Sequence, residues 1–584
     1  MPTFDNKYIA NILSEAADLM EVANDDPFRI RSYRRAAEAI EGLPQQVSEI
    51  WQEPKKLLEI PGIGKGMVAN IQEIFSNQGK LKLHQELLEK YHPSMLELLK
   101  ISGLGPKTIA LIWDAFQVCD VAGVEKLAKE GKLRGLPRLS EKIEQKILRA
   151  IEQYRKVSGR FHIDVADEVA QKLVAQLKGM PGVDKVTPAG SLRRGRETVG
   201  DLDVLVTGKC GENEKQRDAV IAKILELPGI MEVLAKGENK VSFKLRTGMQ
   251  VDVRILAPAS FGAALLYFTG SKNHNVALRQ RALKLGYTLN EYSLARLKTE
   301  KPVASKTEEE IYAKLGLDYI PPELREDSGE IEAAEEHDIP DLVTIEDLRG
   351  DVHMHTVETD GRNTIEEMAE AARERGYKYM AITDHTKNLA MTNGLDDKRA
   401  EKHIKRIHEA AKKFEGIKIL AGIEVDILAD GELDLSDSVL EQMDLVIASV
   451  HSHFSQEPAK MTERILRAIE NKNVSALGHP TGRLLLRREA YEFDIDAVLK
   501  TAAKKRVAME LNSFPDRLDL NDRHLRMAKE RGVKIVINTD SHHTSHMEKI
   551  KYGVLQARRA WLTKEDILNT LPPDKFAKAM KHAW

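Results

Sequence analysis

Hydrophobic and polar positions follow three different patterns along the 584 residues of the chain. The first 150 residues have a helical pattern, interrupted by short turns that contain glycine. Apolar and polar residues then alternate in Asp201-Leu202-Asp203-Val204-Leu205-Val206 and again in Val251-Asp252-Val253-Arg254-Ile255-Leu256, as they do in strands. After residue 350, seven β-rich runs alternate with helical runs. The pattern therefore predicts a multidomain protein that begins with helices, continues as α+β and ends as α/β.

The two alternating strands carry three acids. Because side chains two positions apart share a strand face, Asp201 and Asp203 point the same way, and Asp252 points with Arg254. If the strands are neighbours, three carboxylates meet, and two magnesium ions are their natural counter-charge. Two edge strands with solvated acids are the alternative. The turn Gly190-Ser191-Leu192-Arg193-Arg194-Gly195 just before them favours phosphate binding, since its backbone N–H groups suit phosphate oxygens.

Two glycine turns in the helical region share one pattern, apolar-x-Gly-x-Gly followed by a helix. They are Gly62-Ile63-Gly64-Lys65-Gly66 and Gly103-Leu104-Gly105-Pro106-Lys107, and a weaker third copy starts at Gly135. This is the helix-hairpin-helix pattern, in which a tight turn presents N–H groups to a phosphate at a helix N-terminus. Such contacts do not read base sequence. The predicted DNA-binding residues are Gly62, Gly64, Gly66, Gly103, Gly105 and Lys107.

Histidine is concentrated in the last region, where 13 of the 18 histidines follow residue 350. Nearly every β-rich run there ends in a residue that can bind a metal ion, and the ends of parallel strands converge on one face of a β/α barrel. A single histidine at a strand end is more often structural, but matched ends favour a metal site. The candidate ligands are His353, His355, Asp360, His385, Glu424, His451, His479, Asp540 and His542. Imidazole and carboxylate together suit Zn²⁺, Mn²⁺ or Fe²⁺.

Overall composition adds little evidence for a particular function. A net charge of −3 gives no global basic field for nucleic acid. Two cysteines exclude a disulfide framework. The N-terminal residues lack a signal pattern, and no run is long enough to cross a membrane, so a soluble cytoplasmic protein is expected. Residues 321–347, rich in Glu and Asp, are predicted to be a linker.

The first 320 residues resemble family X nucleotidyltransferases, the group that contains DNA polymerase beta. The resemblance implies that Asp201 and Asp203 hold two Mg²⁺ or Mn²⁺ ions, while Asp252 holds the catalytic ion and helps to activate the primer 3′-hydroxyl. It implies that the segment Tyr267-Phe268-Thr269-Gly270-Ser271 selects the sugar. At the next position the chain differs from the beta-type animal enzymes, which carry an acid where this chain has Lys272. The nucleotide-binding residues implied are Gly190, Ser191, Arg194, Gly200, Tyr267, Phe268, Gly270 and Asn275.

One position departs from the family in a way that bears on activity. The beta-like members carry a lysine after the first hairpin, which forms a Schiff base with a sugar aldehyde. Asn70 occupies that position here, and an amide is not an amine nucleophile. The sequence therefore predicts little or no deoxyribose-phosphate lyase activity.

The last 240 residues resemble the polymerase-and-histidinol-phosphatase (PHP) family, a distorted (β/α)7 barrel. By that resemblance His353, His355, Glu424 and Asp540 hold one ion. Glu424 bridges to a second ion on His451 and His479, while Asp360, His385 and His542 hold a third. His453, His543 and His546 are left over, and their default interpretation is surface residues or residues that only support the ligands.

The combined order resembles bacterial family X DNA polymerases with a PHP domain. That implies a monomeric repair polymerase that fills short gaps, takes dNTPs and gapped or primer-template DNA, and trims 3′ ends with a metal-dependent 3′–5′ exonuclease; action at abasic sites stays open. Two alternatives remain: a vestigial, structural barrel, or a small-molecule phosphatase fused to a DNA-binding module. The predicted domains are 1–90 and 91–155 (helical, DNA-binding), 156–256 (palm), 257–320 (dNTP-selecting), 321–347 (linker) and 348–584 (PHP).

Overall fold

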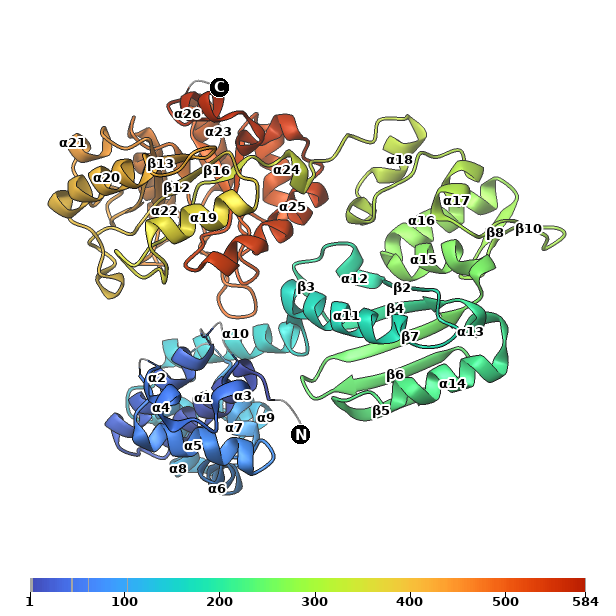
Figure 1. Ribbon diagram of the computed structural model, residues 1–584, viewed down its shortest axis with the longest axis horizontal. Coiled ribbons are helices and arrows are strands. Elements are labelled where there is room, and N and C mark those ends of the chain that lie inside the picture. The colour runs from blue at the N-terminus through green and yellow to red at the C-terminus, as the bar shows by residue number, and fades with distance from the viewer. Residues whose placement is uncertain (1–3, 42, 44–45, 61, 102, 583–584) are drawn as a thin grey trace. The chain divides into compact units, whose positions relative to one another are not determined.

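The computed structural model describes residues 4–41, 43, 46–60, 62–101 and 103–582. The chain forms two compact units, residues 1–158 and 159–584 (Figure 1). The first unit is helical throughout its described part, as the sequence predicts. Its elements are α1 (Asn6–Val22), α2 (Pro27–Glu41), α3 (Val47–Ile50), α4 (Pro54–Leu58), α5 (Lys65–Ser76), α6 (Lys82–Tyr91), α7 (Ser94–Leu98), α8 (Pro106–Phe116), α9 (Val121–Lys129), η1 (Leu133–Gly135) and α10 (Glu141–Val157). One apolar cluster, which includes Leu13, Ile40, Ile71 and Ile112, joins these helices.

The second unit begins with an α+β region, here called the palm. Its main sheet has the order β2-β4-β7-β6-β5, in which only β4 and β7 run parallel. The elements are β1 (Phe161–His162), α11 (Ile163–Lys178), β2 (Lys185–Pro188), α12 (Gly190–Arg193), β3 (Thr198–Val199), β4 (Asp201–Thr207), α13 (Lys209–Glu212), α14 (Glu214–Leu225), β5 (Ile230–Lys236), β6 (Lys240–Leu245) and β7 (Gln250–Leu256). Helices α11 and α14 pack on one face of this sheet against Leu202, Val204 and Val253. The acids of β4 and β7 lie on the opposite face.

A small helical region with a three-stranded sheet, β10-β9-β8, follows the palm. It contains η2 (Pro258–Ser260), α15 (Phe261–Thr269), α16 (Lys272–Lys284), β8 (Tyr287–Leu289), β9 (Leu294–Arg296), β10 (Pro302–Ala304) and α17 (Glu308–Lys314). The almost entirely apolar α15 is buried along most of its length because it contributes to two core clusters.

The acidic stretch 321–347 is folded, which corrects the prediction of a linker set by composition. It forms η3 (Pro322–Leu324), α18 (Glu330–Glu335) and η4 (Ile345–Asp347). Its acids have fixed partners: Glu323 pairs with Arg558 at 2.7 Å and Glu330 with His274 at 2.7 Å. Arg325 is fully buried within it. The acid content alone suggested a linker, because composition does not show that basic residues far away in the sequence neutralise these acids.

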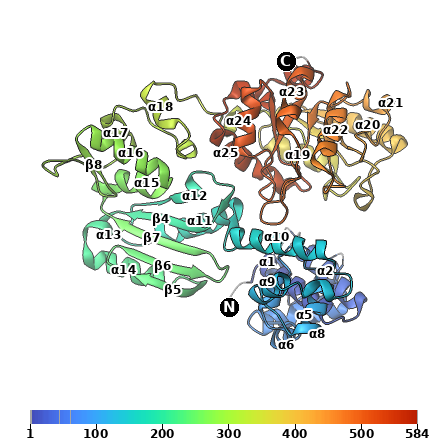
Figure 2. The ribbon, with the colours of Figure 1, turned by 180° about the vertical axis from the view of Figure 1, so that it is seen from behind.

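The last region is a barrel of seven parallel strands in sequential order, β11 to β17, coloured yellow to red in Figures 1 and 2. A parallel bridge between Met354 and Ser541 joins the two ends of the sheet, so the predicted distorted TIM-like barrel is confirmed. The strands are β11 (Gly350–Asp351), β12 (Tyr379–Ile382), β13 (Lys418–Asp426), β14 (Leu445–Ser449), β15 (Ala476–Leu477), β16 (Ala508–Asn512) and β17 (Ile535–Asn538). The helical elements are α19 (Ile365–Glu374), η5 (Ala390–Thr392), α20 (Asp397–Ala411), α21 (Asp437–Leu440), α22 (Pro458–Glu470), α23 (Ile495–Lys505), α24 (Asp522–Glu530), η6 (Thr544–Lys549), α25 (Ile550–Arg559), η7 (Lys564–Asp566), η8 (Leu568–Thr570) and α26 (Pro573–Ala579).

Candidate functional sites

The three predicted acids of the palm lie on one face of its sheet. Strands β4 and β7 are parallel neighbours, and Asp203 lies directly opposite Asp252 in their register. Asp201 and Asp203 share one face because Leu202 between them points into the core. Both strands lie inside the sheet, so the alternative of two edge strands is wrong. The structure therefore places the three acids on neighbouring strands.

The electrostatics of the cluster favour a bound cation. Burial raises the pKa of Asp203 to about 6, and the charges of Asp201 and Asp252 add to the effect. Burial alone would also raise the pKa of Asp252, but Lys240 lies 2.7 Å from its carboxylate and holds that pKa below the usual value. The charges of Lys240 and Arg254 thus offset only part of the three-acid cluster, because the pKa of Asp203 stays raised. Lys240 lies on the neighbouring strand β6 and was not predicted from the sequence.

The glycine turn lies against these acids. Gly190 has φ +60°, and a Cβ built there would lie 2.6 Å from Asp203 Oδ2, so only glycine fits. The turn borders a pocket of about 350 Å³. That pocket is lined by Gly190, Ser191, Arg194, Asp201, Asp203, Tyr267, Phe268, Thr269, Gly270, Lys272, Asn275 and Arg279.

Most of the predicted nucleotide-binding residues line this one pocket, but Gly200 does not. Gly200 lies beside the Arg160 guanidinium instead. The sequence analysis missed Thr269 and Arg279 as lining residues, although Thr269 lies inside the quoted segment. Asn275 donates to the Tyr267 carbonyl oxygen at 2.7 Å. The amide therefore holds the backbone of the segment expected to select the sugar.

The helix-hairpin-helix turns in the first unit have the predicted geometry. Gly62 and Gly103 have φ of +93° and +90°, and Gly64 and Gly105 are the N-caps of α5 and α8. A Cβ added at Gly64, Gly103 or Gly105 would meet no atom within 4 Å. The backbone at these positions is therefore open to a ligand such as a phosphate.

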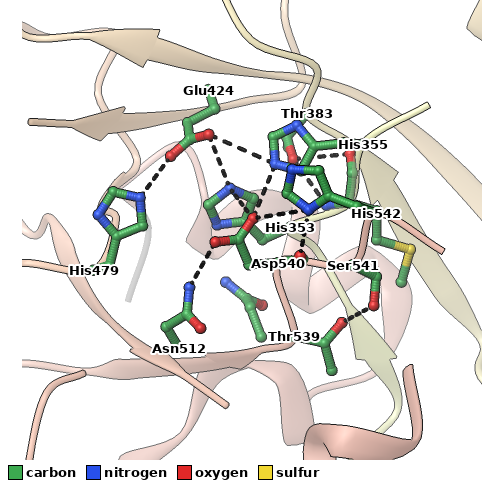
Figure 3. A network of polar contacts seen from close by, with 12 residues as sticks. His353, His355, Thr383, Glu424, His479, Asn512, Thr539, Asp540, Ser541 and His542 are labelled. Atoms are coloured by element: carbon green, nitrogen blue, oxygen red, sulfur yellow. Dashed lines mark hydrogen bonds and ion pairs between the residues drawn. The ribbon is translucent and has the colours of Figure 1, made fainter. Parts of the chain in front are cut away.

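Ligand-type side chains fill one end of the barrel, and Glu424 on β13 lies at their centre. Its Oε1 is 3.0 Å from His479 Nε2 and 3.3 Å from His451 Nε2. Its Oε2 is 2.9 Å from His385 Nδ1 and 3.3 Å from His353 Nε2. Figure 3 shows this carboxylate between His479 on one side and the rings of His353 and His355 on the other. A carboxylate with histidine nitrogens on both oxygens suits a bridging ligand.

Eight of the nine predicted ligands gather into overlapping groups, and His479 lies outside them. His355, Asp360, His385 and His542 form one group, His353, His355 and Asp540 a second, and His385, Glu424 and His451 a third. Within each group one ligand atom per residue lies within 4.8 Å of the others. The grouping differs in part from the prediction, because His355 and His385 are each shared by two groups. His479 lies beside the third group, with its Nε2 3.0 Å from Glu424 Oε1 and its ring centroid 5.0 Å from that of His451.

The donor atoms fit metal ions better than hydrogen bonds alone. His353 Nε2, His355 Nδ1 and Glu424 Oε2 are buried, and none has a hydrogen-bond partner in the described part of the chain. Burial raises the pKa of Glu424, but the charges of His353, His385 and His451 outweigh it and hold that pKa well below the usual value. The carboxylate is therefore ready to bind cations, and buried histidine nitrogens and a carboxylate oxygen without hydrogen-bond partners are what a metal ligand set without its ions has.

Two buried acids outside the predicted ligand set, Glu510 and Asp384, bond the candidate ligands or residues beside them. Glu510 accepts from His353 Nδ1 at 2.6 Å and from the His479 backbone N–H at 2.7 Å. Asp384 contacts His403 Nε2 at 2.8 Å and accepts from Thr356. These acids stand near the ends of the same β-rich runs as the candidate ligands, so their position in the sequence does not distinguish them from the candidate ligands.

Several other candidates have different roles. His453 is exposed. His543 Nδ1 accepts a hydrogen bond from the Ser545 backbone N–H at 3.2 Å. The His546 ring packs on Phe514, with 5.1 Å between the ring centroids. Arg483 pairs with Glu197 of the palm at 2.6 Å, so this side chain connects the barrel to the palm. Arg517 remains beside the site, 3.6 Å from Asp540.

Comparison with known proteins agrees with this architecture. Family models match residues 4–79 (helix-hairpin-helix domain), 95–153 (SAM-like helix-hairpin-helix tandem), 264–326 (DNA polymerase beta thumb) and 351–514 (PHP domain). The chain is 39% identical over 568 residues to the DNA polymerase/3′-5′ exonuclease PolX of Bacillus subtilis, which covers 96% of this chain and 97% of that protein. The chain belongs to the family X DNA polymerases that carry a PHP domain. The tandem match extends past Gly135 and so includes the weaker third copy of the hairpin pattern.

The PHP barrel also resembles shorter family members. Probable phosphatases of Thermoanaerobacter and of Escherichia coli (YcdX) are each 29% identical to it, over 231 and 232 residues. Each match covers 38% of this chain and about nine-tenths of the relative. Among the described residues, no helix has the length and apolar character needed to span a membrane.

Proposed function

We propose that this protein is a DNA-directed DNA polymerase that fills short gaps, with a metal-dependent 3′–5′ exonuclease in its PHP barrel. One observation carries the proposal: a single chain holds both three acids on neighbouring strands beside a phosphate-type turn and the nine candidate ligands of the barrel, eight in overlapping groups and His479 beside Glu424. Degenerate barrels lose ligands, whereas each one here lies within reach of another. The PolX relative bears both activities in its name.

In the palm, Asp201, Asp203 and Asp252 would hold two Mg²⁺ or Mn²⁺ ions. Such ions neutralise a triphosphate and stabilise the entering and leaving oxygens of an in-line displacement. Ser191 and Arg194 bind the β- and γ-phosphates of the dNTP from the turn. Tyr267 and Phe268, whose ring centroids lie 5.0 Å apart, form the wall that crowds a ribose 2′-hydroxyl.

In the barrel, the nine ligands would hold up to three Mn²⁺, Zn²⁺ or Fe²⁺ ions. Ions in such a cluster supply a water of lowered pKa and a Lewis acid for phosphodiester hydrolysis. Glu510 keeps the His353 ring oriented, with Nε2 directed at the Glu424 carboxylate. Arg517 is the side chain placed to pair with the phosphate of the 3′-terminal nucleotide.

DNA is held without regard to sequence. The turns at Gly62–Gly66 and Gly103–Lys107 grip gapped or primer-template DNA through backbone N–H groups, aided by Lys107. We assign residues 1–90 and 91–155 to this binding, 156–256 to the palm, 257–320 to dNTP selection and 348–584 to the nuclease, with 321–347 as the folded connection. The protein is expected to act as a cytoplasmic monomer.

A single assay tests both activities. A labelled primer on a gapped duplex is incubated with Mn²⁺, with and without dNTPs, for wild type, Asp201→Ala/Asp203→Ala and His353→Ala/His355→Ala. We expect the first variant to lose extension only and the second to lose shortening only. Extension by the aspartate variant would refute the palm assignment, and shortening by the histidine variant would refute the barrel assignment.

The phosphatase relatives support one second candidate, hydrolysis of small phosphate monoesters by the barrel. Release of inorganic phosphate from such an ester by wild type, with no shortening of a DNA 3′ end, would favour it. A third outcome, metal-dependent stability without either hydrolysis, would indicate a structural barrel.

A further inference from the structure

The phosphate-type turn of the palm is held from the barrel side by helix α25. Arg559 Nη1 donates to the carbonyl oxygen of Arg194 at 2.8 Å, and Gln556 Nε2 donates to that of Gly195 at 2.6 Å. Gly195 has φ +65°, and a Cβ there would lie 3.1 Å from Leu555. Two consecutive carbonyls of the turn are thus fixed by side chains that lie outside the palm.

The Arg194 side chain is tied to the same helix through a carboxylate. Its Nε donates to Glu326 Oε1 at 3.0 Å, and its Nη1 donates to the Thr269 carbonyl oxygen. Arg559 Nη1 also donates to Glu326 Oε1, at 3.0 Å. Arg194 Nη2 has no hydrogen-bond partner among the described residues, and Arg194 lines the palm pocket. The guanidinium is therefore fixed by two nitrogens, and its third is left for a ligand.

Arg559 is itself rigidly placed. Its side chain is 2% exposed. Its Nε and Nη2 both donate to Asp522 Oδ2, at 3.0 and 2.7 Å. A continuous series of charges, Asp522, Arg559, Glu326 and Arg194, therefore runs from helix α24 of the barrel to the palm pocket.

We propose that Arg559 and Gln556 of the PHP barrel are positioning residues for the dNTP site of the palm. The inference rests on the proposed role of Arg194 in phosphate binding. Arg559 fixes the turn backbone and shares the negative charge of Glu326. Without Arg559, Glu326 would keep only Arg194 and the more distant Arg196, at 3.0 and 3.9 Å, and its charge would compete with the triphosphate for Arg194. Both effects weaken dNTP binding. Part of the binding energy of the dNTP is then spent on ordering the turn and on freeing Arg194 from Glu326.

Simple docking of barrel on palm is the competing explanation, and helix α25 supplies a matched control. Lys551, on the same helix, pairs with Asp167 of α11 at 2.6 Å and does not touch the turn. If α25 only docks the barrel, loss of Lys551 should affect dNTP use as much as loss of Arg559. If the turn is positioned, only Arg559 and Gln556 should matter.

The experiment uses the full chain and single-nucleotide insertion on a gapped primer with Mg²⁺. KM and kcat for the dNTP, 3′-end shortening with Mn²⁺, and the melting temperature are measured for wild type, Arg194→Met, Arg559→Met, Gln556→Met and Lys551→Met. We expect Arg559→Met to raise KM about tenfold or more, as for a lost charged hydrogen bond. Gln556→Met should raise KM about threefold to tenfold. Lys551→Met should have a KM near that of wild type, and shortening should stay unchanged in all four variants.

The outcomes separate the inference from the function beneath it. A normal KM in Arg194→Met would refute the role of the turn, and the inference with it. A raised KM in Arg194→Met with normal values in both Arg559→Met and Gln556→Met would refute the inference alone. Equal effects of Arg559→Met and Lys551→Met, or parallel losses of insertion and shortening, would also refute it in favour of docking. Gln556→Met removes one neutral donor only, so it decides the question if Arg559→Met fails to fold.

Discussion

Arg193 and Glu308 form a two-pronged ion pair between the palm and helix α17. Arg193 Nη1 lies 2.8 Å from Glu308 Oε1, and Arg193 Nη2 lies 2.7 Å from Oε2. Arg325 Nη1 adds a third bond to Oε1 at 2.6 Å. Arg193 lies two positions after Ser191 in the phosphate-type turn. The Glu308 carboxylate therefore fixes one side of this turn. A buried carboxylate shared by two guanidinium groups is strongly stabilised in its charged form.

The stability of this region should depend on pH through Glu308. Burial raises the pKa of Glu308, but the hydrogen bonds and charges of Arg193 and Arg325 outweigh it and lower the pKa to about 2 from 4.5. Because the folded pKa lies below the unfolded one, the stabilisation is complete above pH 4.5 and is lost as the pH falls toward 2. It amounts to about 3 kcal/mol at pH 7. Glu308→Gln should lower the free energy of unfolding by at least that amount at pH 7.

Calorimetric melting of wild type and Glu308→Gln between pH 7 and pH 3.5 measures the effect. The gap in melting temperature between wild type and Glu308→Gln should be constant down to about pH 5 and should narrow below that pH. Glu309→Gln, at the neighbouring exposed position, is the control and should melt with wild type. A gap that stays constant down to pH 3.5 would contradict the assignment.

Gly190 should tolerate no side chain. Alanine there would place a methyl group 2.6 Å from Asp203 Oδ2 at a φ of +60°, which costs about 1–2 kcal/mol of backbone strain besides the clash. Displacing a metal-binding carboxylate should reduce nucleotide insertion by about a hundredfold or more, since 2.7 kcal/mol of lost transition-state stabilisation has that effect. End shortening should be unchanged. Gly237→Ala, with its nearest atom at 3.7 Å and no positive φ, should insert nucleotides like wild type.

Glu510→Gln should weaken metal binding in the barrel without removing any ligand. The carboxylate accepts from His353 Nδ1, the His479 N–H and Asn538 Nδ2, so an amide would face at least one donor with its own NH₂ group. Loss of such a supporting partner typically costs 10–100-fold in metal affinity, and we expect about that decrease for Mn²⁺. Isothermal titration calorimetry with Mn²⁺ measures this affinity in wild type and in Glu510→Gln. Unchanged affinity would mean that Glu510 does not orient His353.

Deoxyribose-phosphate lyase activity should be absent. Asn70 Nδ2 donates to Tyr33 Oη at 2.8 Å, so a side-chain amide occupies the position of the expected lysine and is already engaged. No amine is available there for a Schiff base. Borohydride reduction with a 5′-deoxyribose-phosphate substrate should trap no covalent adduct. An adduct that disappears in Lys65→Ala would show instead that Lys65, at the start of α5, has taken over the role.

Short-range periodicity explains what the sequence could reveal. The spacing of Asp201 and Asp203 fixed their shared face, and the strand ends located ligands such as His353 and Glu424. Lys240, Glu510 and Arg559 were missed because each acts through a partner that no periodicity connects to it. The folded segment 321–347 was missed for the same reason, since Arg558 lies more than 200 positions from Glu323.

Metal removal should destabilise the barrel selectively. Without ions, the buried Glu424 carboxylate is balanced by histidine rings, and that of Asp540 by histidine rings and by Arg517 at 3.6 Å. Several buried polar atoms of the site have no hydrogen-bond partner among the described residues. Mn²⁺ at about 100 times its Kd should add about 2.7 kcal/mol of stability. That raises the melting temperature of the barrel transition by about 5–10 °C. The increase should disappear in His353→Ala/His355→Ala and persist in Asp201→Ala/Asp203→Ala, because the palm acids belong to a different site. Calorimetry with Mn²⁺ or with a chelator reads this out, and an equal increase in both variants would place the tight metal site outside the barrel.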